Sequence, residues 1–352
     1  MKTNTFNINK LIRGNIKQMK PYASARSEFT SKAADLVFLD ANENPFENGL
    51  NRYPDPQQLS LKEVLAKQKS VQAENILLGN GSDEVLDLIF RVFCEPSIDN
   101  VITLPPTFGI YDVLANTNNI ENRKVVLNDN FQPDVDAILA SIDVNSKLLF
   151  ICSPNNPTGN SIDATSITKL LKLFNGLVVI DEAYIDFSSK ESWISKLDNF
   201  SNLIVTQTLS KAYGLAGIRL GICYASKEII AVLNKIKLPY NINELTQQKA
   251  LEKILLINQV KNEISLVLDE KEKLLKELLQ INFVREIYPS DANFVLIKVD
   301  DANKRYQQLI ENGIVLRNRT TQALLENCLR ITVGTKKENE KLIKSLLLIS
   351  KC

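Results

Sequence analysis

Short apolar runs alternate with amphipathic stretches between about residues 60 and 223. Residues 148–151 and 177–180 are apolar at every position, which is typical of strands buried on both faces. Between such runs, apolar residues recur at helical spacing. The pattern predicts strands at 75–78, 100–104, 124–127, 147–152, 176–180, 203–206 and 219–223, and helices at 82–93, 108–115, 134–140, 163–174 and 227–236. Alternating strands and helices predict an α/β domain with a mostly parallel, doubly wound central sheet.

The pattern changes after about residue 239. Residues 247–279 are rich in Lys, Glu and Leu at helical spacing and contain no Gly or Pro, which predicts one long connecting helix. Strands are then predicted at 283–287, 294–299, 314–317 and 329–333, followed by a helix at 336–349. We therefore expect three parts: an N-terminal arm at 1–40, a large α/β domain at 41–239, and a smaller α+β domain at 240–352. The arm is expected to contribute to the small domain and to the active site.

Composition excludes several chemistries. The chain has 352 residues and no histidine, so a Ser-His-Asp triad, a Cys-His pair and imidazole metal ligands are impossible. In an enzyme of this kind, Lys, Tyr, Asp, Glu, Cys or a cofactor must move protons. With 42 Lys and Arg against 41 Asp and Glu, the formal net charge is +1. Nucleic acids and anionic membranes both require a basic surface, so neither is expected as a partner.

Cysteine spacing and the N-terminus favour a cytoplasmic protein. The five cysteines are scattered, with no CxxC pair or metal-ligand spacing, and we expect reduced thiols and no metal site. They are Cys94, Cys152, Cys223, Cys328 and Cys352. Residues 1–22 lack the apolar core of a signal peptide, and no apolar run approaches the roughly 20 residues that span a bilayer.

Two segments with reactive side chains follow predicted strands. Lys211 comes after Ser210, and a Gly- and Ala-rich turn then leads to Arg219. This arrangement suits a Schiff-base lysine whose neighbours hold a phosphate, although a surface lysine beside a flexible loop would look the same. Asp181 stands where a buried strand ends and is expected to face a ligand crevice. A helix N-cap or a structural ion pair is the alternative for this aspartate.

Two further segments lie at the same kind of position. Residues 153–159 follow a buried strand, although Asn-Pro and Thr-Gly pairs would also make a plain turn. Residues 79–84 leave another strand and open a helix, whose free N–H groups suit a phosphate. A capped glycine turn is also common without a ligand. All four segments leave predicted sheet strands, which favours one shared site. The Gly79-Asn80-Gly81-Ser82-Asp83-Glu84 sequence lacks the GxGxxG of a nicotinamide dehydrogenase.

These segments, together with residues 39–45, 51–55, 105–111 and 328–334, resemble the class II-type aminotransferases of fold type I, which use pyridoxal 5'-phosphate. Within that group the chain is most similar to the histidinol-phosphate aminotransferases, over residues 22–334. The resemblance implies transamination of L-histidinol phosphate with 2-oxoglutarate to imidazole-acetol phosphate and glutamate, a step of histidine biosynthesis. Aminotransferases for aromatic amino acids and phosphothreonine decarboxylases share the scaffold and remain alternatives. A non-catalytic cofactor-binding regulator is disfavoured, because no basic DNA-binding region is appended.

The resemblance also assigns roles around the cofactor. Lys211 would bind the cofactor covalently and move the proton, and Asp181 would pair with the pyridine nitrogen. Tyr184 and Asn156 would bind the ring 3-oxygen, and Phe108, a position where many relatives have Tyr, would stack on the ring. The residues expected to hold the cofactor phosphate are Ser82 and Asp83 through their backbone N–H groups, and Thr208, Ser210 and Arg219 through their side chains.

Other assignments concern the substrate and a second subunit. Tyr53 resembles a tyrosine that reaches the cofactor phosphate of a neighbouring subunit, which implies a homodimer; the alternative is an aromatic that packs in the turn before Pro54. Arg330 matches the arginine that binds the co-substrate carboxylate. Arg317 resembles a second substrate arginine, with Arg319 as its competitor because residues 318–327 follow no familiar pattern. Tyr22 and Asn42 resemble residues that close over the substrate.

Overall fold

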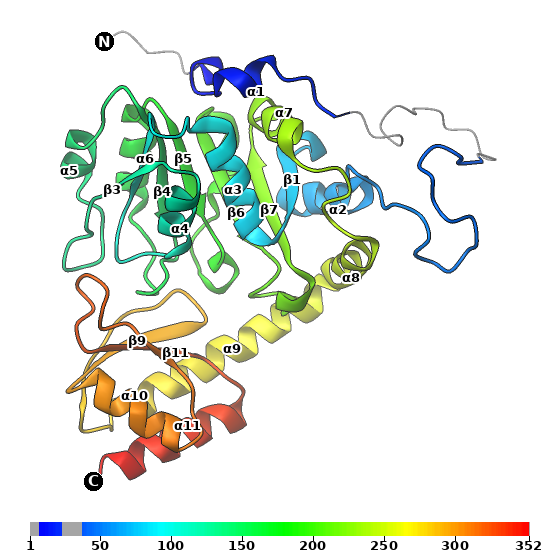
Figure 1. The fold of residues 1–352 in the computed structure, drawn as a ribbon. Helices are drawn as coiled ribbons and strands as arrows, with labels where there is room; N and C mark the ends of the chain where they lie inside the picture. Colours follow the sequence, from blue (N-terminus) through cyan, green and yellow to red (C-terminus); the bar gives the residue numbers. More distant parts are fainter. Residues whose placement is uncertain (1–6, 23–36, 352) are drawn as a thin grey trace.

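The computed structural model describes residues 7–22 and 37–351. Its larger part is built on a seven-stranded sheet with the spatial order β1-β7-β6-β5-β4-β2-β3 (Figure 1). The strands are β1 (Ile76–Asn80), β2 (Asn100–Thr103), β3 (Glu121–Lys124), β4 (Ser146–Cys152), β5 (Leu177–Asp181), β6 (Leu203–Thr208) and β7 (Leu220–Ala225). Only β7 runs antiparallel to its neighbours. The mostly parallel sheet predicted from the apolar runs is confirmed.

Helices cover both faces of this sheet. One face packs against α2 (Leu59–Lys69), α5 (Val135–Ala140) and α6 (Ala164–Leu173), and the other against α1 (Gly14–Gln18), α3 (Gly81–Phe93), α4 (Ile110–Thr117) and α7 (Lys227–Ile236). Along β5, Val178 and Ile180 enter the first core, while Leu177 and Val179 enter the second. Successive side chains of a strand point to opposite faces, so an unbroken apolar strand follows from burial on both sides.

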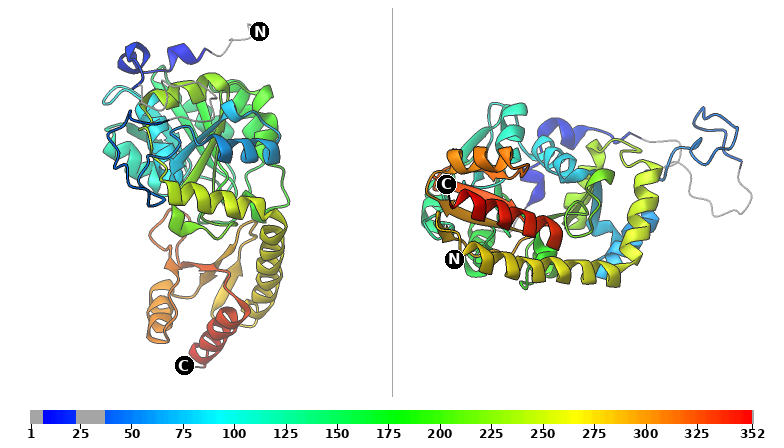
Figure 2. Two further views of the ribbon diagram at one scale, coloured as in Figure 1. Left: turned by 90° about the vertical axis from the view of Figure 1, so that its right-hand side faces the viewer. Right: turned by 90° about the horizontal axis from the view of Figure 1, so that it is seen from below.

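The smaller part contains an antiparallel sheet with the order β10-β11-β9-β8. Its strands are β8 (Val284–Ile287), β9 (Phe294–Val299), β10 (Arg317–Asn318) and β11 (Cys328–Thr332), and its helices are α10 (Ala302–Glu311) and α11 (Lys336–Ile349). These elements surround a core of their own. Figure 2 shows this layer below the larger sheet, with a long helix along its flank.

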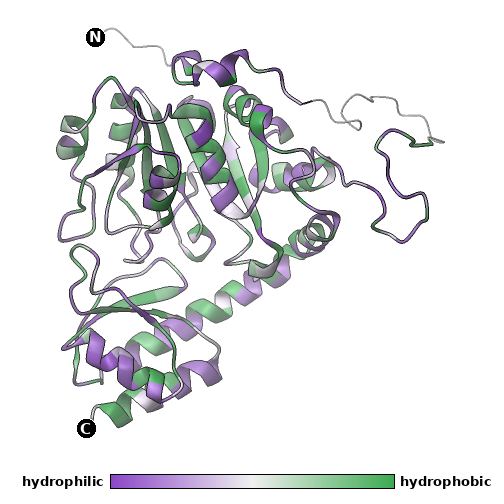
Figure 3. Cartoon of the chain, in the orientation of Figure 1, coloured by the Kyte–Doolittle hydropathy of each residue, from purple (hydrophilic) through white to green (hydrophobic). Residues whose placement is uncertain are grey.

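The single long connecting helix predicted at 247–279 is wrong. Two helices occupy this region, α8 (Glu244–Leu255) and α9 (Ile257–Leu278). Leu256 lies between them with the non-helical angles φ −86° and ψ 38°. The break contains neither glycine nor proline, which is why the hydrophobic pattern did not predict it. In Figure 3, α9 alternates between green and purple along its length, as expected of a helix with one face against the core and one in solvent.

Two predicted strands are displaced. The third strand lies at 121–124, before the predicted 124–127. It is a polar strand at the edge of the large sheet. Because its side chains are not buried, its sequence has no apolar pattern that would mark it as a strand. The strand predicted at 314–317 begins only at Arg317, because the Ile314 N–H instead closes the end of α10 by donating to Leu309 O at 2.9 Å. Gly313, with φ +71°, permits this turn.

The two described N-terminal segments differ in their contact with the larger part. The described residues 7–22 include η1 (Ile8–Lys10) and α1. Leu11, which follows η1, and Ile16 in α1 join the core beneath α3 and α7. Arg13 fixes this segment by donating from Nε to Glu95 Oε2 at 3.2 Å. Residues 37–58, in contrast, form no helix or strand and project away from the sheet in Figure 1. The boundaries of the expected arm and domains remain predictions.

Candidate active site

One cavity of about 420 Å³ lies between the two sheets. The large sheet supplies the carboxyl ends of β4, β5 and β6, and α3 begins beside them, while β10 and β11 form the opposite wall. Carboxyl ends of parallel strands meet at one edge of a sheet, which is where open α/β sheets bind ligands. The predicted site residues that line the cavity are Ser82, Asp83, Phe108, Asn156, Asp181, Tyr184, Thr208, Ser210, Lys211, Arg219, Arg317 and Arg330.

Asp181 ends β5 and is almost fully buried. Its Oδ2 accepts a hydrogen bond from the Tyr111 hydroxyl at 2.8 Å, and its Oδ1 accepts one from the Ala183 N–H at 3.2 Å. Burial raises the pKa of Asp181 above its ordinary value, and the bond from Tyr111 opposes this shift. The structural alternatives for this residue are not observed, because Asp181 forms no ion pair among the described residues and the N-cap of the next short helix is Tyr184. The Asp181 carboxylate lines the cavity.

Lys211 lies in the turn that follows β6, and its Nζ is 5.7 Å from the centroid of the Tyr184 ring. Desolvation lowers the pKa of Lys211, and the positive charge of Arg330 lowers it further. Burial raises the pKa of Tyr184, so its hydroxyl stays protonated. A lysine with a lowered pKa beside a protonated phenol can act as an amine nucleophile and as a base.

The start of α3 forms an anion-binding end of the cavity. The cap residue Asn80 makes no side-chain capping bond. The Gly81 N–H donates to the Arg219 carbonyl oxygen at 2.8 Å, so the N–H groups that follow it, those of Ser82 and Asp83, are the ones that suit a ligand. Two glycines allow the neighbouring groups to pack closely at this end, because a side chain at either position would clash with them. A Cβ at Gly81, which has φ +81°, would lie 2.5 Å from Arg219 Nη2, and a Cβ at Gly221 would lie 2.2 Å from the Ser82 nitrogen. This close packing places a guanidinium directly beside the helix start.

Hydroxyls and a charge pair complete this end. Thr208 donates from Oγ1 to Ser210 Oγ at 3.0 Å, and both residues line the cavity beside the helix start. Arg219 has the left-handed φ of +57° and donates from Nη2 to Asp83 Oδ2 at 3.2 Å. The group of donors suits a phosphate, since helix N–H groups, hydroxyls and a guanidinium all donate to phosphate oxygens.

Three arginines form the opposite wall. Arg317 and Arg330 are paired across β10 and β11, and Arg319 follows two residues later in the same loop. Among the described residues, no carboxylate forms an ion pair with any of the three. Both Arg319 and Arg330 have a buried Nε without a hydrogen-bond partner. Desolvation, followed by the charges of Arg330 and Arg317, lowers the pKa of Arg319 to about 10.

Arg330 is held in place although it lacks an acid partner. Its Nη1 donates to Asn156 Oδ1, and its Cζ lies 5.1 Å from the centroid of the Phe294 ring. Arg330 and Asn156 are 174 positions apart in the chain, so the contact joins the two sheets across the cavity. A wall of cations with unmet donors is suited to anionic ligands.

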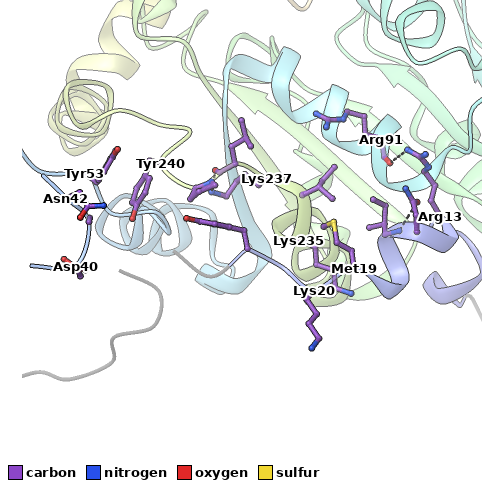
Figure 4. A pocket seen from close by; sticks show the side chains of 17 residues that line it. Arg13, Met19, Lys20, Asp40, Asn42, Tyr53, Arg91, Lys235, Lys237 and Tyr240 are labelled. Carbon is purple, nitrogen blue, oxygen red and sulfur yellow. Dashed lines mark hydrogen bonds between the residues drawn. The ribbon is translucent and has the colours of Figure 1, made fainter. Parts of the chain in front are cut away.

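Three predicted site residues lie elsewhere in the single chain. Tyr53, Asn42 and Tyr22 line a second cavity of about 1010 Å³ instead of the one that contains Lys211. Figure 4 shows Tyr53 beside Tyr240 at one end of this second cavity, and their ring centroids are 4.5 Å apart in a stacked arrangement.

Sequence reasoning missed Tyr111, the partner of Asp181. The available signal was its position three residues after Phe108 in the same conspicuous segment. The four described cysteines are buried free thiols. No cluster of three or more possible metal ligands occurs within residues 7–22 and 37–351, and no helix in that part of the chain is long and apolar enough to cross a membrane.

Comparison with known proteins identifies the family. Residues 30–346 match the model of the family "Aminotransferase class I and II". The chain belongs to this family. A curated relative, the histidinol-phosphate aminotransferase of Flavobacterium johnsoniae, is 63% identical over 99% of this chain and 100% of its own length.

Solved aminotransferase structures share the fold. The histidinol-phosphate aminotransferase from Clostridium acetobutylicum superimposes with a TM-score of 0.80 at 25% identity, covering 86% of this chain and 91% of its own. The enzyme of that name from Sinorhizobium meliloti, solved in complex with pyridoxal-5'-phosphate, gives a TM-score of 0.79 at 24% identity, covering 85% of this chain and 83% of its own. The expected fold type, with a large mixed sheet and a smaller antiparallel one, is therefore confirmed for this aminotransferase.

Proposed function

We propose that this aminotransferase uses pyridoxal 5'-phosphate to transfer an amino group from L-histidinol phosphate to 2-oxoglutarate. The observation that carries the proposal is the wall of Arg317, Arg319 and Arg330, which has no acid partner among the described residues and stands across the cavity from Lys211. Both substrates have an anionic group away from the reacting atom, a phosphate in one and a carboxylate in the other. Relatives between 46% and 63% identical carry the name histidinol-phosphate aminotransferase.

The cavity fits this cofactor. The uncapped start of α3, with Ser82 and Asp83, would receive the phosphate together with Thr208, Ser210 and Arg219. Asp181, on the cavity wall, would bind the pyridine nitrogen, and Phe108 would pack against the ring. Tyr184 and Asn156 would donate to the ring 3-oxygen. When bound, the cofactor supplies an aldehyde that accepts the amino group and a ring that withdraws electrons.

Lys211 is the proposed base. Its lowered pKa increases the fraction of neutral amine, and its Nζ would move the proton between the substrate Cα and C4′ of the cofactor. The chain contains no histidine that could do this. Tyr184, which remains protonated, would orient the reacting groups by donating from its hydroxyl. The Arg330 guanidinium would bind the carboxylate of 2-oxoglutarate, and Arg317 or Arg319 the phosphate of the other substrate.

The proposal includes a homodimer. In the projecting segment, Val37, Leu39 and Phe46 are 83%, 88% and 79% exposed, and three largely uncovered apolar side chains in one short segment support a surface that a partner covers. A second copy of the chain would cover this segment and receive Tyr53 at its cofactor phosphate, with Tyr22 and Asn42 near its substrate. Equilibrium sedimentation measures this assembly. The proposed location is the cytoplasm, which four buried free thiols favour.

Activity with three substrates tests the function. We expect transamination of histidinol phosphate with 2-oxoglutarate to be much faster than that of phenylalanine, with no carbon dioxide released from phosphothreonine. Lys211→Ala should reduce the rate roughly 10²- to 10⁴-fold, the contribution of a positioned acid–base group, and Lys196→Ala, on the surface, should not. Faster turnover of phenylalanine, or decarboxylation of phosphothreonine, would replace the proposed reaction by one of the two alternatives.

A further inference from the structure

Tyr111 makes a contact that the proposed mechanism does not yet use. It is the second residue of α4 and is only 1% exposed. Its ring stacks on Phe150 with centroids 4.9 Å apart and meets the edge of Phe108 at 5.8 Å. Its hydroxyl reaches the Asp181 carboxylate with a 2.8 Å hydrogen bond. The tyrosine is therefore rigidly packed, and its one polar atom is directed at the carboxylate at the base of the cavity.

Asp181 depends on few donors. Its two oxygens accept hydrogen bonds from Tyr111 and from the Ala183 N–H. Burial, the largest effect, raises the pKa of Asp181 and favours the neutral acid, and the Thr206 hydroxyl opposes this shift together with Tyr111 and Ala183. A neutral acid could not pair with a protonated ring nitrogen. Hydrogen bonds from donors to the charged form oppose protonation and also fix the direction of the remaining lone pairs.

We propose that Tyr111 is a positioning residue that holds Asp181 as an oriented carboxylate for the pyridine nitrogen of the cofactor. This role rests on the proposed function, because it requires that the cavity binds pyridoxal phosphate. Tyr111 itself would not touch the cofactor nitrogen. Its hydrogen bond would hold the Asp181 side chain in one rotamer and would favour the ionised carboxylate over the protonated acid.

A tyrosine suits this task in a chain without histidine. Burial, followed by the charge of Asp181, raises the pKa of Tyr111 well above its ordinary value, so its hydroxyl donates at every pH near neutrality. An imidazole in the same place would change its charge in that range. The other titratable groups around Asp181 are Cys152 on β4, Asp83 at the start of α3, Tyr184 after β5 and Lys211 after β6. Burial raises the pKa of Cys152, which keeps this neighbour neutral as well.

Tyr111→Phe tests the role because it keeps the stacked ring and removes only the hydroxyl. Tyr224→Phe is the matched control, since Tyr224 is fully buried on β7 and its hydroxyl has no hydrogen-bond partner. The first measurement is the dissociation constant of pyridoxal phosphate and the absorption spectrum of the bound cofactor. We expect Tyr111→Phe to weaken cofactor binding roughly 10- to 100-fold, the range for removing a hydrogen bond to a charged group, and to change the spectrum. Tyr224→Phe should do neither.

The second measurement is the stability of the cofactor-free protein against pH. The folded pKa of Asp181 lies above its ordinary value of 3.8, so its contribution to stability is present below pH 3.8 and is lost as pH rises through the folded pKa. Tyr111→Phe should extend this loss to higher pH.

Equal cofactor affinity, spectrum and pH dependence in Tyr111→Phe and the wild type would overturn the proposed role. A uniform loss of stability with unchanged cofactor affinity would also overturn it, because it would make Tyr111 a packing residue only. If the wild type itself bound no pyridoxal phosphate, the proposed function would fail together with this role. In that case the pH measurement would still test the hydrogen bond.

Discussion

The two walls of the cavity differ in how their polar groups are satisfied. On the large-sheet wall, the Asp181 carboxylate accepts bonds from Tyr111 and Ala183. On the small-sheet wall, Arg319 and Arg330 each leave a buried Nε without a partner. Buried donors normally find acceptors within the protein, so the Asp181 carboxylate is held by the protein itself, whereas the unmet donors of Arg319 and Arg330 are suited to a ligand. This difference supports the proposed function, in which the large-sheet wall would hold the cofactor and the small-sheet wall, with its cationic groups, would bind the substrates.

Arg330→Gln should have the largest effect of the changes on the substrate wall. We expect kcat/KM to fall roughly 10²- to 10³-fold, since a bidentate guanidinium makes two hydrogen bonds to a charged ligand. The ligand-free protein should become more stable, because the change removes an unpaired buried charge next to Arg317. Steady-state kinetics and thermal unfolding measure the two effects. Arg285→Gln, at an exposed position of β8, is the control. A loss of stability in ligand-free Arg330→Gln would contradict the comparison.

Changing the other two arginines separates their roles. Arg319 is partly buried with an unmet Nε, whereas Arg317 is exposed. We therefore expect Arg319→Gln to raise the KM for histidinol phosphate roughly 10-fold or more. Arg317→Gln should raise it no more than about 5-fold, as is usual for an exposed ion pair. Added salt should weaken the contribution of Arg317 more strongly. The reverse order of effects would make Arg317 the main phosphate-binding residue.

Changing Glu182, next to Asp181, should have the smallest effect on activity. It tests whether a buried carboxylate at the end of β5 is satisfied by hydrogen bonds from the protein alone. Burial raises its pKa to about 7, although Ser192, Trp193 and Gln207 all donate to it. Because the folded pKa exceeds the ordinary value of 4.5, its stabilising contribution is present below pH 4.5 and is lost as pH rises to about 7. Over this range the free energy of unfolding should fall by up to about 3 kcal/mol relative to Glu182→Gln.

Chemical unfolding at a series of pH values measures this slope. Glu191→Gln is the control in the same loop, because hydrogen bonds from Ser195 and Lys196 lower the pKa of that exposed carboxylate. It should not remove the loss of stability with rising pH. An identical slope in Glu182→Gln and the wild type would show that the Glu182 carboxylate is ionised when buried, without cost to folding.

Hydrophobic patterns in the sequence correctly predicted the helices and strands whose side chains are buried in the core. The apolar runs of β4 and β5 identified central strands, because both faces of those strands are covered. α7 and α11 were predicted with their observed bounds, since each begins after a capping Ser or Thr. The polar edge strand β3 was displaced, because no burial imposes a hydrophobic pattern on it. The break at Leu256 had no signal in the residue types.

By itself, the sequence determined which chemistry is possible. A chain without histidine must move protons with other groups, and local hydrophobic patterns placed two candidates, Lys211 and Asp181, at strand ends. The tertiary structure decided which groups meet. Tyr111 and Asp181 are 70 positions apart, and Asn156 and Arg330 are 174 apart. Such contacts depend on how strands and sheets pack, so no local pattern contains them, and both the support of the carboxylate and the wall of arginines arise only in the folded chain.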